Sequence, residues 1–131
     1  MTRSLWAFVA WTLFLWATRI RNVVQDDELS TGAAGLAGAI AVVFLLASIS
    51  LPVLAARRRD LLGRAVRVVM TATILWWAMR LVTNLVGDGS VGFKAVHTIL
   101  AVLTIALASA ILAAPIADRS AQLPLREANT T

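Results

Sequence analysis

Two residue types that carry much of protein chemistry are missing or almost missing from this chain. Its 131 residues include no cysteine, and His97 is the only histidine. Without cysteine the chain has no disulfides, thiolate nucleophiles, iron–sulfur clusters or zinc–thiolate sites. One histidine cannot supply a bis-histidine haem or a two-histidine metal site within a single chain. We therefore expect no cofactor and no resident metal.

Charged residues are also scarce. They make up 15% of the chain, whereas hydrophobic residues make up 60% and the mean hydropathy is +0.82. A soluble domain of this size carries about 25% charged and about 45–50% apolar residues. Four long apolar runs take up most of the sequence, so the composition predicts a multi-pass membrane protein.

The charges that remain are mostly positive. The net charge is +5, the calculated pI is about 11.6, and eleven of the twelve basic residues are arginine. The arginines cluster beside apolar runs, where orientation in the membrane and contact with anionic headgroups explain them. Because the chain has no basic face on a soluble module, we expect no binding to nucleic acid. The bias to arginine and alanine fits GC-rich coding and hence a bacterial source.

The apolar runs predict an all-α integral membrane protein with a single four-helix domain over residues 1–117. Each run has about 20 residues or more, enough for a helix to cross ~30 Å of hydrocarbon, and open strands cannot satisfy their backbone in lipid. The first run lacks the cleavage site of a signal peptide, so we read it as a retained helix. Residues 118–131 are predicted to form a short, polar, disordered cytoplasmic tail. The predicted spans are about 5–24, 33–56, 66–86 and 92–117.

The basic residues also predict orientation. The connection between the second and third spans carries one acid, Asp60, and five arginines: Arg57, Arg58, Arg59, Arg64 and Arg67. Basic residues near span ends stay in the cytoplasm, which places this connection and both termini on the cytoplasmic side of the cell membrane, with the connection against anionic headgroups. The other two connections are acidic, with Asp26, Asp27 and Glu28 in the first and Asp88 in the third. Four basic residues on the predicted outer side weaken this bias: Arg19, Arg21, Arg80 and Lys94.

The connections contain residues that start and stop helices. Ser30 or Thr31 is placed to cap the second helix, and Ser90 is placed to cap the fourth. Gly87 and Gly89 are predicted to end the third helix in a left-handed turn.

The chain contains two similar halves. The segment LWATRIRNVVQD, residues 15–26, resembles WWAMRLVTNLVGD, residues 76–88, and the shared residues are Trp, Ala, Arg, Asn, Val and Asp. Further on, residues 46–48 and 107–109 both read LAS. We therefore predict two helical-hairpin repeats of about 5–56 and 66–117, as expected for self-similarity at a fixed period. Both hairpins would cross the membrane in the same direction.

Each copy places four polar or aromatic residues on one helix face, because their spacings of three and four follow the helical repeat. We call these faces the first and second ladders. The first consists of Trp16, Arg19, Asn22 and Asp26, and the second consists of Trp77, Arg80, Asn84 and Asp88. Arg19 and Arg80 lie roughly 8–9 Å below the predicted outer ends of their helices, at a rise of 1.5 Å per residue.

Two interpretations of Arg19 and Arg80 are open. A single arginine at this depth can lay its methylene groups in lipid and lift its head to the interface. Alternatively, the two arginines point inward and share a cationic site, because a charge at bilayer depth usually faces protein or water. Asp26 and Asp88 would then neutralise the arginines or line a vestibule.

Other residues carry weaker indications. The acids of the first connection lack the alternating spacing of a calcium loop, so we do not expect a metal there. His97, one turn after Lys94, could sense the outer medium or simply hydrogen-bond a neighbouring helix. Small residues recur at every fourth position in two spans and permit close helix contact. They are Ala33, Ala37 and Ala41 in the second span, and Ala106, Ala110 and Ala114 in the fourth.

Three functional classes follow from these features. The first is a non-enzymatic accessory protein whose charged outer half docks another membrane protein or a second copy of the chain. The second is a small transporter or channel component that handles an anion at Arg19 and Arg80. The third, an intramembrane enzyme, is the weakest, because no nucleophile–base pair or metal-ligand spacing is present.

Overall fold

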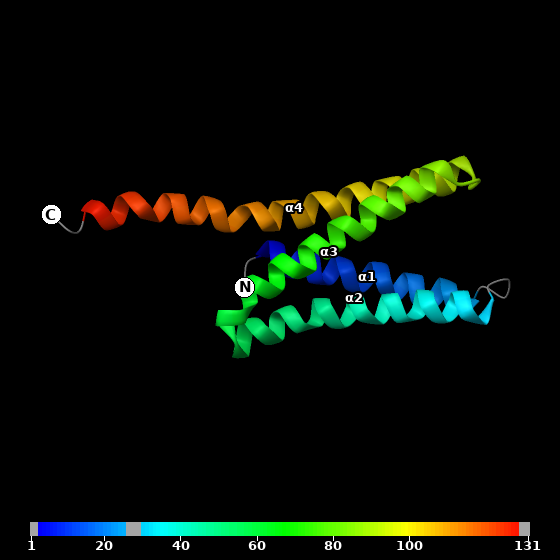
Figure 1. The fold of residues 1–131 in the computed structure, drawn as a ribbon, viewed down its shortest axis with the longest axis horizontal. Coiled ribbons are helices and arrows are strands. Elements are labelled where there is room, and N and C mark those ends of the chain that lie inside the picture. Colours follow the sequence, from blue (N-terminus) through cyan, green and yellow to red (C-terminus); the bar gives the residue numbers. More distant parts are fainter. Residues whose placement is uncertain (1–2, 26–29, 129–131) are drawn as a thin grey trace. The chain divides into compact units, whose positions relative to one another are not determined.

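The structure, a computed structural model, consists of four helices in chain order. It describes the backbone of residues 3–25 and 30–128, and side chains in these ranges as far as Ala114. The helices are α1 (Arg3–Gln25), α2 (Thr31–Arg57), α3 (Arg59–Val86) and α4 (Val91–Ala128) (Figure 1). The all-α prediction is confirmed. The chain divides into two compact units, Met1–Val69 and Met70–Thr131.

Three of the helices are long and apolar enough to cross a membrane. They are Thr31–Arg57, Arg59–Val86 and the part of α4 from Val91 to Ala114. Only 17–22% of their most apolar windows is buried inside the protein, so most of this apolar surface must be covered by something other than the chain, as a bilayer would do. Within the described residues α1 falls outside this group, since its 23 residues include three arginines and three tryptophans.

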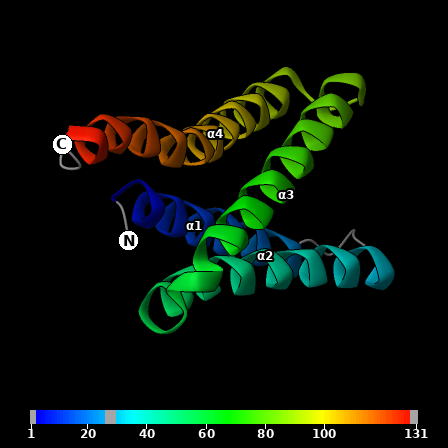
Figure 2. The same cartoon turned by 60° about the vertical axis from the view of Figure 1, so that its left-hand side comes forward.

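In the first unit α1 and α2 pack against each other as an antiparallel pair. The two helices run side by side in both Figure 1 and Figure 2. On α1 the buried residues recur at helical spacing and form one face: Leu5, Phe8, Val9, Thr12 and Trp16. On α2 the buried residues are Ala41, Ser48 and Leu51. The ring of Trp16 stacks on that of Phe44, with centroids 4.9 Å apart and planes 12° apart.

The connection between α2 and α3 is much shorter than predicted. Only Arg58 separates the two helices, with an extended φ of −142° and ψ of 69°, so α3 begins at Arg59 rather than near Val66. The amide of Arg58 donates to the carbonyl of Leu54, 2.8 Å away, and closes α2. Arginine, leucine and alanine are good helix formers, which explains why the polar stretch continues the helix instead of forming a loop.

The second unit contains the end of α3, a tight turn and α4. Its buried side chains also recur at helical spacing, with Met70 and Thr73 on α3 and with Ala101, Thr104, Ala108 and Ile111 on α4. Residues 118–128, for which the sequence predicts a disordered tail, continue α4 in the structure. The stripe formed by Ala106, Ala110 and Ala114 is exposed, so the face of α4 that packs is a different one from the face the small residues suggested.

Serine caps begin α2 and α4, as predicted. The hydroxyl of Ser30 accepts from the amide of Ala33 at 3.3 Å, and that of Ser90 accepts from the amide of Phe93 at 3.3 Å. The predicted left-handed glycine turn is wrong, because neither Gly87 nor Gly89 has a positive φ. The amide of Gly87 instead continues the helical pattern by donating to the carbonyl of Thr83 at 3.0 Å.

Candidate functional site

The first ladder occupies the half of α1 that leads to α2 in the sequence. Trp16 is buried, Arg19 is half-buried and Asn22 is exposed, while Asp26 lies outside the described residues. The stack of Trp16 on Phe44 fixes the orientation of this face, since Arg19 follows Trp16 by three residues and lies on the same side of the helix. The lower part of the ladder therefore faces α2.

The opposing part of α2 is built from small residues. Because the helices are antiparallel and Trp16 contacts Phe44, Arg19 is level with Ala41, which is 1% exposed. Beyond Ala41, the segment of α2 from residue 32 to residue 39 reads GAAGLAGA. Gly32, Gly35 and Gly38 each have open space where a Cβ atom would stand. Small side chains therefore predominate in the part of α2 beyond the level of Arg19.

The second ladder is half-buried along most of its length. Trp77, Arg80 and Asn84 are half-buried on α3, and Asp88 is exposed in the turn. Across the described residues, no hydrogen bond or ion pair is formed by the guanidinium of Arg80 or by the carboxylate of Asp88. Neutralisation of Arg80 by Asp88 is thus not seen. A half-buried cation of this kind has the charge to attract an anion.

The turn between α3 and α4 holds two further polar groups at fixed positions. The ammonium of Lys94 donates to the carbonyl of Leu85 at 3.2 Å, and so satisfies an acceptor in the last turn of α3. The Nδ1 atom of His97 lies 2.9 Å from the carbonyl oxygen of Phe93. A carbonyl oxygen only accepts, so Nδ1 is the donor in this contact.

The ring of Phe93 lies between Gly89 and His97. The ring centroids of Phe93 and His97 are 3.9 Å apart, and a Cβ atom at Gly89 would come within 3.0 Å of the Phe93 ring. Glycine at position 89 therefore leaves space for an aromatic ring, and it does not form a left-handed turn. The position of His97 depends in this way on a residue in the turn.

Replacing Gly89 by alanine should displace the Phe93 ring and loosen its contact with His97. An added methyl in a packed site costs about 1–3 kcal/mol, and the cost here should fall at the low end, because the side chain that must move is flexible. The measurement is the chemical shift of the His97 ring protons together with the unfolding midpoint in mixed micelles. Gly92→Ala is the matched control, since nothing lies within 4 Å of its Cβ position. An unchanged His97 spectrum in Gly89→Ala would contradict this account.

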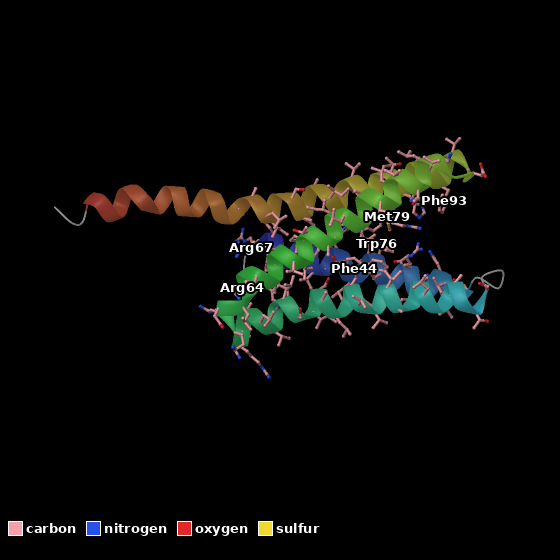
Figure 3. The ribbon with its side chains drawn as sticks, viewed as in Figure 1. Phe44, Arg64, Arg67, Trp76, Met79 and Phe93 are labelled. Atoms are coloured by element: carbon pink, nitrogen blue, oxygen red, sulfur yellow. The ribbon has the colours of Figure 1, made fainter. Side chains whose placement is uncertain are left out.

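The five arginines of the α2–α3 junction are all exposed. Arg58 pairs with Asp60 at 3.5 Å, and the Nε atoms of Arg59 and Arg67 donate to the carbonyls of Ala55 and Gly63. Figure 3 shows Arg64 and Arg67 projecting from the start of α3. Since their Nε atoms are used along the helix, Arg59 and Arg67 keep both terminal nitrogens available for an anionic partner.

The two ladders belong to different units of the chain. A site shared by Arg19 and Arg80 stays a prediction. Within the described residues no three His, Asp or Glu side chains gather in one place.

Three side chains near the ladders were not singled out from the sequence. Phe44 follows from helical register once the antiparallel pair is known, but an isolated phenylalanine in an apolar run gives no signal. Lys94 could have been recognised as the only lysine, placed one turn inside a helix beside an acidic turn. Ser48, buried on the face that contacts α1, looks in the sequence like any other small residue.

Comparison with known proteins gives no relative. The chain matches no protein-family model, and neither the curated proteins nor the solved structures contain a match. The function must therefore be argued from the residues themselves.

Proposed function

We propose that this chain is a non-enzymatic accessory protein of the cell membrane. In this proposal all four helices span the bilayer, and the half that carries the ladders docks another membrane protein. The observation that supports it is the half-buried state of Arg19 and Arg80. The guanidinium of Arg80, which has no partner among the described side chains, presents a cation on an apolar helix, where a partner's acidic or carbonyl oxygen could satisfy it at less cost than lipid.

The span of α1 is part of the proposal. Its 23 residues extend roughly 35 Å at 1.5 Å per residue, which is long enough for a bilayer. Its charges lie near its two ends, at Arg3 and at Arg19 and Arg21. Its inner face is the most buried in the first unit, so packing on α2 compensates for its lower hydropathy.

The burial pattern supports two hairpin repeats. Buried Val9 and Thr12 correspond to buried Met70 and Thr73 at a separation of 61 residues. In the second helices the buried pairs fit a separation of 60, and so do the capping serines Ser30 and Ser90. These pairs are Ala41 with Ala101, Ser48 with Ala108, and Leu51 with Ile111. The burial thus favours 60 over the 61 suggested by the LAS triplets.

A second candidate function is a small transporter or channel component for an anion. It is favoured by Arg80, whose guanidinium has no partner among the described side chains. A bound anion would supply acceptors for this guanidinium. The wide exposure of the apolar faces does not discriminate between the two functions.

The change of Arg19 and Arg80 together to glutamine should separate the two functions. If the chain is an accessory, the double variant should recover roughly tenfold less of a co-purified membrane partner, the scale of losing an interface hot spot, and the wild-type protein alone should carry no anion flux in proteoliposomes. If the chain transports an anion, wild-type protein should show flux and the double variant should lose it.

Arg21→Gln is the matched control for this experiment. Arg21 lies between the ladder residues Arg19 and Asn22 in the sequence and is exposed. It corresponds to Val82 in the second copy. We expect it to behave as wild type. Equal loss in Arg21→Gln and in the double variant would contradict a specific role for the ladder arginines and favour simple interfacial charge.

We also propose that the α2–α3 junction rests on anionic lipid headgroups. Its exposed arginines stand at the ends of two apolar helices, where a negatively charged leaflet attracts basic residues by about 1 kcal/mol each. This contact would keep the helices oriented across the bilayer. It would leave the half of the protein that carries the ladders free for a partner.

A further inference from the structure

The middle of α2 contains a polar group that the protein itself does not satisfy. The side chain of Ser48 is fully buried, and its Oγ atom has no hydrogen-bond partner. Two other hydroxyls in the helices are bonded: Ser50 donates to the carbonyl of Ala47 at 2.6 Å, and Thr104 donates to that of Leu100 at 2.7 Å. An orphan hydroxyl in an apolar interior is costly, so Ser48 needs an explanation.

Pro52 adds a second unsatisfied group at the same residue. In an α-helix the carbonyl of Ser48 accepts from the amide of residue 52, but proline has no amide hydrogen. The helix bond that would end on this carbonyl is therefore missing. Ser48 thus presents a hydroxyl and a carbonyl oxygen, both close to the same point on the helix.

A third oxygen lies across the helix pair. Trp16 contacts Phe44, and because α1 and α2 are antiparallel, the next turn away from the α1–α2 connection places Thr12 level with Ser48. Both residues belong to the buried faces that the two helices turn toward each other, and Thr12 is 4% exposed. The apolar neighbours one turn further on, Val9 and Leu51, are also buried and close the interface at that end.

We propose that these three oxygens bind an internal water molecule between α1 and α2. A buried water needs two to four polar partners, and it can donate to the Ser48 carbonyl while it bonds with the hydroxyls of Ser48 and Thr12. Water fits better than a metal cation, because the oxygens are neutral and no carboxylate is near to balance a buried charge. The water would satisfy the backbone freed by Pro52, as ordered waters do at prolines in membrane helices.

The second hairpin shows what the same position looks like without this site. Ala108 occupies the place of Ser48 and is also fully buried, and residue 112, in the place of Pro52, is leucine, whose amide can complete the helix bond. An alanine is therefore sterically acceptable at this position of the fold. Loss of stability in a Ser48→Ala variant could not be blamed on the alanine itself.

The test is water-to-amide magnetisation transfer by NMR on the full chain in nanodiscs with deuterated lipid. Wild type should show transfer from a bound water to amides around Ser48, and Ser48→Ala and Pro52→Ala should each abolish or strongly reduce it. Ser50→Ala is the matched control, since the Ser50 hydroxyl already has a partner three residues away, and it should leave the signal unchanged.

Stability gives an independent readout. If Ser48 holds a water, Ser48→Ala should raise the unfolding equilibrium constant by roughly tenfold, the scale of one buried polar group left unpaired. If the hydroxyl is a plain orphan, replacing it by a methyl should make the protein more stable. No water signal in wild type, or a Ser48→Ala variant more stable than wild type, would overturn the proposal.

Discussion

Replacing Trp16 by alanine should destabilise the protein more than any other single change in the ladders. The side chain is 3% exposed and its ring stacks on Phe44. Truncating a buried tryptophan costs about 3–5 kcal/mol in soluble cores. We expect roughly 3 kcal/mol here, because lipid removes the hydrophobic part of the driving force and leaves the packing part. Unfolding in mixed micelles, followed by helical circular dichroism, measures the loss.

Trp6→Ala is the control for this prediction. Trp6 is on the same helix but 54% exposed, so its removal should change stability by less than about 0.5 kcal/mol, as for other surface substitutions. Trp16→Phe should keep the stack and recover most of the loss. If Trp6→Ala and Trp16→Ala were equally destabilised, the stack of Trp16 on Phe44 would not be a main source of stability in the first unit.

Much of the fold could be predicted from the sequence because hydropathy and capping act locally. The runs of apolar residues mark α2, the later part of α3 and the first part of α4, and Ser30 and Ser90 mark two helix starts by their side-chain chemistry. The junction at Arg58 was missed for an equally local reason. A polar, basic stretch reads as a loop, although arginine and leucine favour helix wherever nothing breaks it.

The packing could be predicted only in part. In a membrane protein apolar side chains face both lipid and protein, so hydropathy alone cannot tell exposed Leu46 from buried Leu51. The small-residue rule selected Ala41 correctly and selected the exposed Ala106 wrongly. The face that packs is set by the partner helix, which the spacing of small residues within one helix does not encode.

The candidate site shows the same division between local and distant information. The spacing of Trp16 and Arg19 could be read as one helix face, and the stack on Phe44 gives that face a direction. The relation between Arg19 and Arg80 is a tertiary property that spacing within each copy cannot supply. The turn glycines show a further limit: glycine indicates freedom of the backbone, whereas at Gly89 the missing Cβ atom leaves room for the ring of Phe93.

Neutralising the five arginines of the α2–α3 junction should change how the whole chain lies in the membrane. With Arg57, Arg58, Arg59, Arg64 and Arg67 changed to glutamine, three basic residues remain at the proposed inner side and four at the outer side. The excess of basic charge that sets orientation then disappears. We expect the native chain to take one orientation in the membrane and the five-arginine variant to be a mixture of the two opposite orientations. Since the chain has no cysteine, one introduced thiol reports the side without background.

The reporter is Asp88→Cys, in the exposed turn between α3 and α4, probed in intact cells with a maleimide that cannot cross the membrane. In the otherwise native chain this thiol should be labelled from outside, and in the five-arginine variant labelling should fall by roughly half. Asp60→Asn should leave labelling unchanged, because acidic residues contribute little to orientation. Full labelling in the five-arginine variant would show that the helices, not the junction arginines, fix the orientation.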